Sequence, residues 1–172
     1  MKRSLFKLFT VMVLLGMIIS ACSPATTEAP PATEAPSQPQ APAEPVMVEK
    51  TVTIGFTSSV AGSLEVASKR QANAFNLWMD QVNEAGGINL SDGTVVKFAV
   101  QTYDDESNKE RVQELYTRLI TEDNADFLIS PYSSGLTDAS AVIAEQYGKI
   151  MITTGAASDS TYQKGYSLVF QT

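Results

Sequence analysis

The sequence predicts an α/β fold in which a doubly wound parallel sheet is covered by helices. Runs of apolar or alternating residues, typical of strands, recur along residues 50–172. Stretches with apolar residues at helical spacing separate these runs. Strands that alternate with helices form parallel sheets through right-handed crossovers, with helices on both faces.

The first strand is predicted at Thr51–Phe56, because alternate apolar residues there share one face. A polar turn leads into a helix over Leu64–Ala85, which Gly86 and Gly87 end. Residues at i, i+3, i+4 and i+7 predict its buried stripe, formed by Phe75, Trp78, Met79 and Val82.

The second strand follows a hairpin-like entry, for which Asp92-Gly93 is a turn signal. Ser107 and Glu110 fit a capping box for the next helix. In that helix Tyr116 is expected to be a core residue, as Trp78 is in the first one.

A third strand is predicted at Asp126–Ser130, whose continuous apolar run suits a strand covered on both faces. The third helix ends near Gly148. A strand at 149–153, a loop or short helical turn at 158–165, and a strand at 167–171 complete the pattern.

The N-terminus has the character of a lipoprotein signal. Basic residues precede a short apolar run from Leu8 to Ile19, which is too short for a comfortable membrane span. Ile19-Ser20-Ala21-Cys22 resembles the bacterial lipobox, whose cysteine is lipidated. We therefore expect residues 1–21 to be a signal peptide and Cys22 to carry a membrane anchor.

Residues 22–49 are expected to be a disordered spacer. Seven of the eight prolines lie between Pro24 and Pro45, among alanine, threonine and glutamate. Such a segment cannot bury enough apolar surface to fold and extends by roughly 3 Å per residue. It would tether the domain at 50–172 to the outer face of a bacterial membrane.

Charge and composition exclude several functions. The formal charge is −7, and it becomes −10 when Lys2, Arg3 and Lys7 leave with the signal. An acidic surface argues against nucleic acid as a partner. Because the chain has no histidine and a single cysteine, it offers no Ser-His-Asp triad, histidine metal site or thiolate site. No cofactor is expected.

Ligands of parallel sheets bind outside the carboxyl ends of the strands. That rule selects the segments Thr57–Gly62, Tyr103–Glu106, Pro131–Leu136 and Thr154–Asp159. Three of them are rich in serine, threonine, glycine and alanine. Hydroxyls and free helix N-terminal N–H groups can hold a carboxylate. The candidate ligand contacts are Ser133, Ser134, Gly155, Ala156 and Ser158, with Tyr103 and Tyr132 as possible pocket walls.

Each candidate also has a purely structural interpretation. Ser133 or Ser134 can simply cap the third helix, a contribution of about 1 kcal/mol. Gly155–Ser158 can be a tight turn. Asp104 and Asp105 can act as an acid/base pair, but solvation of a strand end is the simpler interpretation. The residues alone leave these alternatives open.

Taken in order, these motifs resemble the substrate-binding proteins of ABC transporters for branched-chain amino acids, which have the type 1 periplasmic-binding-protein fold. The resemblance covers 52–172. It rests on IGFTSSVAGS, FNLWMDQVNEAGGI, YDDESN, SPYSSGLTDASAVIAEQYGKIMITTGAASD and KGYSLVFQT.

The resemblance implies two lobes that close on a ligand, of which this chain supplies the first, incomplete lobe. By position, Ser133 and Ser134 match the ligand-binding serine and its neighbour, and Ala156 matches a small residue whose backbone binds ligand. Ala157 stands where many relatives have threonine, so Ser158 is the candidate substitute. Half a site and an exposed apolar edge are therefore expected.

The implied function is capture of a branched-chain or related small amino acid for an ABC permease, without catalysis. Amides, urea and other small carboxylates remain alternative ligands. A tethered sensor domain is an alternative role. A serine hydrolase is disfavoured, because there is neither histidine nor a Gly-x-Ser-x-Gly elbow.

Overall fold

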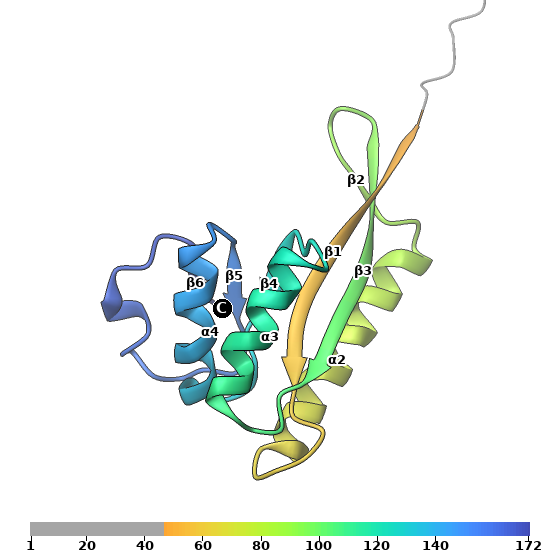
Figure 1. The fold of residues 1–172 in the computed structure, drawn as a ribbon. Helices are drawn as coiled ribbons and strands as arrows, with labels where there is room; N and C mark the ends of the chain where they lie inside the picture. Colours follow the sequence, from red (N-terminus) through yellow and green to blue (C-terminus); the bar gives the residue numbers. More distant parts are fainter. Residues whose placement is uncertain (1–46) are drawn as a thin grey trace, which may run out of the picture. The chain divides into compact units, whose positions relative to one another are not determined.

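The computed structural model describes residues 47–172 and confirms the predicted α/β architecture (Figure 1). The expected signal peptide, Cys22 and nearly all of the spacer lie outside these residues. The elements are β1 (Val48–Ser58), α2 (Glu65–Glu84), β2 (Ile88–Asn89), β3 (Thr94–Asp104), α3 (Lys109–Thr121), β4 (Phe127–Ile129), α4 (Ser134–Gln146), β5 (Met151–Thr153), the 3-10 turn η1 (Tyr162–Lys164) and β6 (Val169–Gln171).

The strands form one sheet in the order β2-β3-β1-β4-β5-β6. All neighbours are parallel except β2 and β3, which are antiparallel and joined through the predicted turn at Asp92 and Gly93. The chain passes from β1 to β3 on one side and then to β4 on the other. The strand order therefore reverses between β1 and β4, where doubly wound sheets bind ligands.

Helices cover the two faces unequally. Helices α3 and α4 pack side by side on one face, and α2 lies on the other (Figure 1). Beneath α3 and α4 lies a core of buried residues that includes Tyr116, Leu119, Leu128 and Met151. A second core under α2 contains Val52, Ile54, Phe56, Val96 and Ile129. Tyr116 is fully buried, as predicted.

The face that α2 covers is more exposed than the sequence indicated. Trp78 was predicted to be a core residue, but it is 42% exposed while its ring packs near Phe75 and Phe98. Phe127 on β4 and Phe170 on β6 are 39% and 50% exposed. The reason is geometric, since α2 packs over β1 and β3 and leaves this side of β4–β6 largely open.

The predicted capping box before α3 is wrong. Glu106 and Ser107 have φ values of 52° and 59°, so the chain turns through the left-handed region first. The helix then begins after Asn108, whose side chain accepts the Arg111 N–H at 2.9 Å. Asparagine is as good an N-cap as serine, and Ser107 is left free for the contacts described below.

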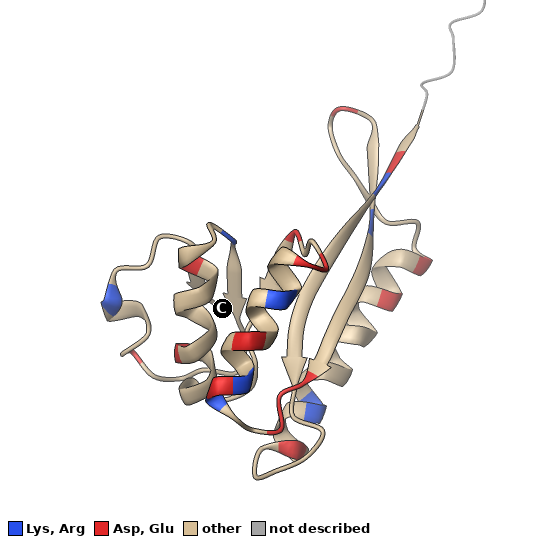
Figure 2. Cartoon of the chain, viewed as in Figure 1, with Lys and Arg blue, Asp and Glu red and all other residues tan. Residues whose placement is uncertain are grey.

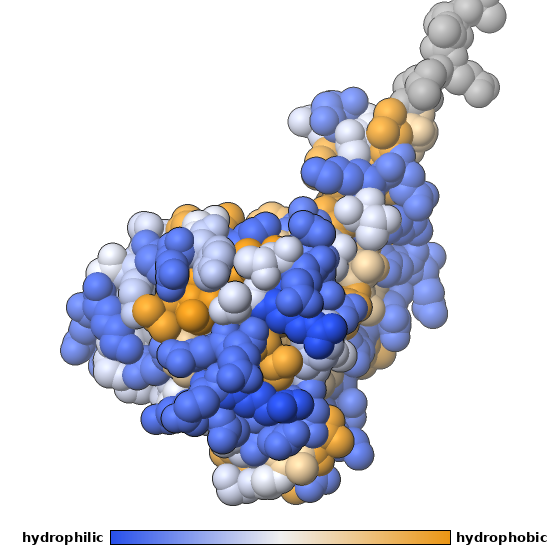
Figure 3. All heavy atoms as spheres, in the orientation of Figure 1, coloured by the Kyte–Doolittle hydropathy of each residue, from blue (hydrophilic) through white to orange (hydrophobic). Residues whose placement is uncertain are grey.

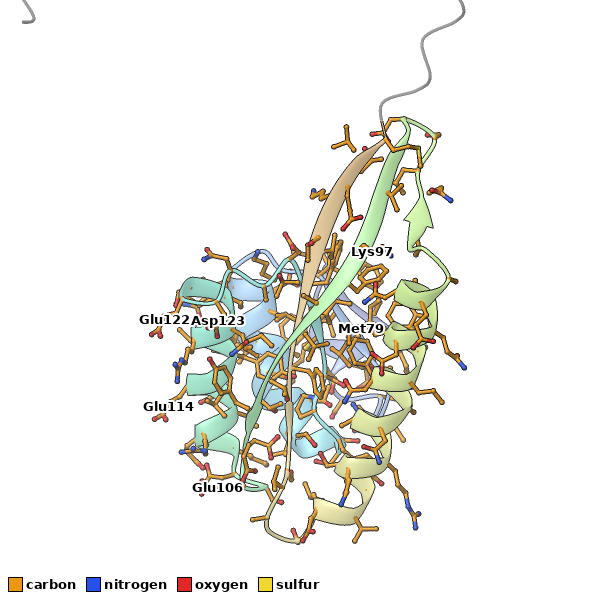
Figure 4. All side chains as sticks on the ribbon, turned by 90° about the vertical axis from the view of Figure 1, so that its right-hand side faces the viewer. Met79, Lys97, Glu106, Glu114, Glu122 and Asp123 are labelled. Atoms are coloured by element: carbon orange, nitrogen blue, oxygen red, sulfur yellow. The ribbon has the colours of Figure 1, made fainter. Side chains whose placement is uncertain are left out.

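Among residues 47–172, no helix combines the length and apolar character needed to cross a bilayer. Charged residues occur on all three α-helices, and acidic ones gather in the loop after β3 (Figure 2). Glu106 lies at that end of β3, whereas Lys97 lies further back along the strand (Figure 4).

Candidate functional site

The segments that follow β4 and β5 meet at the sheet edge, as the sequence predicted. The Ser133 N–H donates to the Gly155 carbonyl at 3.2 Å. Ser134 Oγ accepts the N–H groups of Ala157 at 3.2 Å and Ser158 at 3.1 Å. These bonds hold both segments together beside the point where the strand order reverses.

Ser133 combines a helix cap with an unusual backbone. Its Oγ accepts the Leu136 N–H at 3.3 Å, and its φ and ψ are 87° and 145°. These angles lie near a region that glycine alone occupies easily, at a cost of about 1–3 kcal/mol for other residues. Strain of this kind clusters at binding sites. Ser133 thus caps α4, as one interpretation of the sequence predicted. Its strained backbone also makes it a candidate ligand contact.

Ser134 is the first residue of α4 and is half-buried. Its oxygen already accepts two backbone N–H groups from the neighbouring segment. A serine hydroxyl has one proton to donate beside its acceptor sites, so only the donor remains for a ligand. The geometry makes Ser134 chiefly a residue that positions Ala157 and Ser158.

The segment after β5 is built tightly. A Cβ on Gly155 would stand 2.4 Å from Gln71 Oε1 and 3.0 Å from Tyr132 Cδ2, so a larger residue there would have to displace the Gln71 side chain. Ala156 is buried, and its carbonyl accepts from Gln171 Nε2 at 3.3 Å. Ala157 is exposed.

Ser158 Oγ lies 2.8 Å from Ser160 Oγ, so the hydroxyl proposed to replace a missing threonine has a local partner.

A hollow of about 540 Å³ opens next to this joint. Its volume lies within the usual range for small-molecule sites. Two predicted residues line it, Tyr132 and Gly155. Thr154, which also lines it, begins a segment that the sequence selected. The remaining lining was not predicted as part of a site and comes from one side of α2: Ala67, Arg70, Gln71, Ala74 and Phe75.

The residues of α2 that line the hollow follow a helical spacing. Ala67, Arg70, Gln71 and Ala74 recur at three- and four-residue spacing, which places them on one side of a helix. Small side chains there leave room beside the sheet edge. Because alanine and charged residues are common on any exposed helix, the sequence alone gave no reason to select them.

Tyr103 does not join this group. Its hydroxyl donates to Asp123 Oδ2 at 2.9 Å, and the Arg118 guanidinium lies 4.7 Å from its ring centre. These contacts tie the ring to α3, which covers the other face of the sheet from α2. The structure thus places Tyr103 away from the hollow that Tyr132 lines.

The loops after β1 and β3 are joined by a buried carboxylate. Asp105 is fully buried and accepts hydrogen bonds from Thr57 Oγ1 at 2.7 Å and from Ser59 Oγ at 2.5 Å. It also accepts the Ser107 N–H at 3.0 Å. The sequence favoured a solvated strand end here, whereas the structure shows an interior anchor.

Ser107 completes that joint. Its Oγ donates to the Ala61 carbonyl at 3.0 Å and accepts the Leu64 N–H at 3.2 Å. A Cβ on Gly62, whose φ is 91°, would come within 2.6 Å of the same oxygen. The same loop, between β1 and α2, carries Val60, which is 66% exposed. Apolar residues are visible at the lower end of the molecule, where this loop lies (Figure 3).

Tyr116 on α3 contacts the end of β4, next to the point where the strand order reverses. Burial raises the pKa of its phenol, which therefore stays neutral, and its hydroxyl donates to the Ile129 carbonyl at 2.5 Å. Residues 47–172 contain no group of acidic side chains arranged to hold a metal ion. The arrangement is suited to non-covalent binding by hydroxyls, backbone amides and one arginine.

A model of the periplasmic binding protein family matches residues 51–172. The chain belongs to this family. The match covers nearly all of the described residues, and it confirms the resemblance that the sequence motifs carried. The members of this family are binding proteins rather than enzymes.

Individual relatives agree. A leucine-, isoleucine-, valine-, threonine- and alanine-binding protein of Pseudomonas aeruginosa is 25% identical over 122 residues, which are 71% of this chain and 31% of the relative. A branched-chain amino acid transporter substrate-binding protein of Streptococcus pneumoniae, solved with isoleucine, aligns with a TM-score of 0.63 and 30% identity over 71% of this chain and 33% of that one.

A second solved structure shares the fold. The solute-binding protein of an ABC transporter from Rhodopseudomonas palustris, in complex with 3,4-dihydroxybenzoic acid, aligns with a TM-score of 0.59 and 19% identity over 70% of this chain and 31% of that one. The chain spans about a third of the length of these relatives.

Proposed function

We propose that this protein is the solute-binding component of an ABC importer and captures a small amino acid or a related carboxylate outside the cytoplasm. The observation that carries the proposal is the joint between Ser133–Ser134 and Gly155–Ser158, beside a hollow lined by α2 and the segments after β4 and β5. Relatives with the same fold bind leucine, isoleucine or an aromatic acid.

The mechanism is binding coupled to closure of two lobes, as in other periplasmic binding proteins. In this lobe, Ser133 would offer its hydroxyl, and exposed Ala157 and half-buried Gly155 would offer backbone groups. The partners are then a small solute, a permease that receives it and a membrane reached through the lipid anchor on Cys22. Family membership supports an extracytoplasmic location, and the anchor remains part of the proposal.

The test is calorimetry on the full-length protein with L-leucine, L-isoleucine and small carboxylates. Ser133→Ala should weaken binding by roughly 1–3 kcal/mol, because it leaves a buried polar group of the ligand without a partner. Ser91→Ala, in the exposed turn between β2 and β3, is the matched control and should leave binding unchanged. Equal affinities of the wild type and Ser133→Ala would remove Ser133 from the site.

A further inference from the structure

We propose that Arg70 on α2 is a specificity-determining residue that binds a carboxylate of the ligand in the 540 Å³ hollow. The proposal rests on the proposed solute-binding function and names the ligand class of the same site. The ligand is a carboxylate with an apolar or aromatic body.

The first argument is charge. Arg70 is the one charged residue in the lining of the hollow. None of the ion pairs formed among residues 47–172 uses Arg70; they join Arg111 to Glu106, Arg118 to Glu122 and Lys164 to Asp138. A guanidinium without a protein carboxylate, on the wall of a hollow, favours an anionic ligand. Its planar fork matches a carboxylate with two parallel hydrogen bonds.

The second argument is the shape and polarity of the rest of the wall. Ala67, Ala74 and Phe75 give it an apolar side, while Tyr132 and Thr154 add hydroxyl groups. Binding sites for small molecules have this composition, mostly apolar with a few placed polar groups. A carboxylate at Arg70 would leave the body of the ligand against the alanines and the phenylalanine.

The third argument is that the helix carrying Arg70 is held firmly. Ser68 Oγ accepts the Ser59 N–H at 2.8 Å, which joins α2 to the end of β1. Gln71 Nε2 donates to the Ser130 carbonyl at 2.7 Å, which joins α2 to the end of β4. Arg70 lies between these two attachments. Its backbone is therefore fixed relative to both strands at the reversal point, which lowers the ordering cost of binding.

The experiment uses the full-length protein and two matched pairs of ligands, 4-hydroxybenzoate with 4-hydroxybenzamide and L-leucine with L-leucinamide. The variants are Arg70→Gln, Arg70→Lys and Lys69→Gln. Lys69→Gln removes an equal charge from the adjacent residue, which does not line this hollow.

Arg70→Gln should weaken binding of the preferred acid about ten- to hundredfold, because charge-assisted hydrogen bonds are lost. The affinity of Arg70→Lys for this acid should lie between those of the wild type and Arg70→Gln, since lysine keeps the charge but lacks the planar guanidinium fork. Lys69→Gln should stay within about twofold of the wild type. No variant should change binding of the amides, which the wild type should bind more weakly than the acids.

Three results would overturn the role of Arg70. The first is an equal loss of affinity in Arg70→Gln and Lys69→Gln, which would indicate general electrostatics. The second is wild-type protein that binds amides as tightly as acids. The third is binding of neutral solutes with no binding of acids, which would leave the transport function standing. A wild type that binds no small solute would reject the proposed function itself.

Discussion

At the residue scale, two adjacent aspartates have opposite surroundings. Asp104 is partly exposed and accepts backbone N–H groups from Val60 and Glu106, each within 2.9 Å. Asp105 is fully buried among two hydroxyls and one N–H. A buried carboxylate is tolerated only when it is hydrogen-bonded on all sides. Asp105 therefore determines how the loops after β1 and β3 meet.

Asp105→Ala should lower the free energy of unfolding by about 3 kcal/mol, because it leaves the hydroxyls of Thr57 and Ser59 buried without an acceptor. Asp104→Ala, the neighbouring control, should cost about 1 kcal/mol or less, since water can replace its contacts. Urea denaturation of the full-length protein measures both. Equal costs for the two variants would contradict the anchoring role of Asp105.

At the element scale, α4 holds the chain segment between β5 and β6. Asp138 and Glu145 are two turns apart and lie on the same side of the helix. Asp138 accepts from Thr161 Oγ1 and pairs with Lys164 at 3.4 Å. Glu145 accepts from Ser167 Oγ at 2.7 Å and from the Leu168 N–H at 3.0 Å. One helix thus fixes both ends of the segment that follows the joint between Ser133–Ser134 and Gly155–Ser158.

Glu145 makes this attachment dependent on pH. The hydrogen bonds from the Ser167 side chain and backbone lower its pKa below the ordinary value of 4.5. A carboxyl with a lowered pKa in the folded state stabilises the protein above its unfolded pKa, and this contribution is lost as pH falls through the folded pKa. The window therefore lies on the acid side of 4.5.

We therefore expect Glu145→Gln to melt at a lower temperature than the wild type at pH 7, with the gap closing in acid below pH 4.5. Glu114→Gln, on the outer side of α3 (Figure 4), is the control and should show no such pH-dependent gap. Thermal melts followed by circular dichroism from pH 7 to pH 3 measure this. A difference in melting temperature that stays constant with pH would mean that the charge of Glu145 does not contribute to stability.

At the scale of the whole molecule, the two helix layers give the lobe two different sides. Helices α3 and α4 bury a continuous core, whereas α2 alone stands on the opposite face with Trp78, Phe127 and Phe170 partly exposed. The hollow and Arg70 belong to the α2 side. Among the described residues, the face with less packing is therefore the one that carries the hollow.

The proposed tether is tested on the whole protein in its bacterial host. Cys22→Ser should abolish incorporation of labelled fatty acid and release the protein from the membrane fraction, because the lipid supplies the anchoring energy. Ser23→Ala, at the next residue, is the control and should keep both. Membrane retention of an unlabelled Cys22→Ser protein would reject the lipid anchor.

Much of this fold was predictable because its patterns are local. Strand and helix order, the turn at Asp92-Gly93 and the meeting of Ser133 with Gly155 followed from periodicity and the rule for parallel sheets. The start of α3 was missed because Ser107 is used by a distant loop. Burial of Asp105 and exposure of Trp78 depend on which elements pack together. The position of Arg70 in the wall of the hollow also depends on this packing, so the local sequence pattern does not predict it.

The backbone of Ser133 has an evolutionary consequence. Glycine at this position would relieve a cost of about 1–3 kcal/mol but would remove both the helix cap and the hydroxyl. Under the proposed function, selection for yield or heat resistance alone would tolerate Ser133→Gly, and selection for solute uptake would restore serine. The position would then represent a trade-off between local stability and the proposed solute contact.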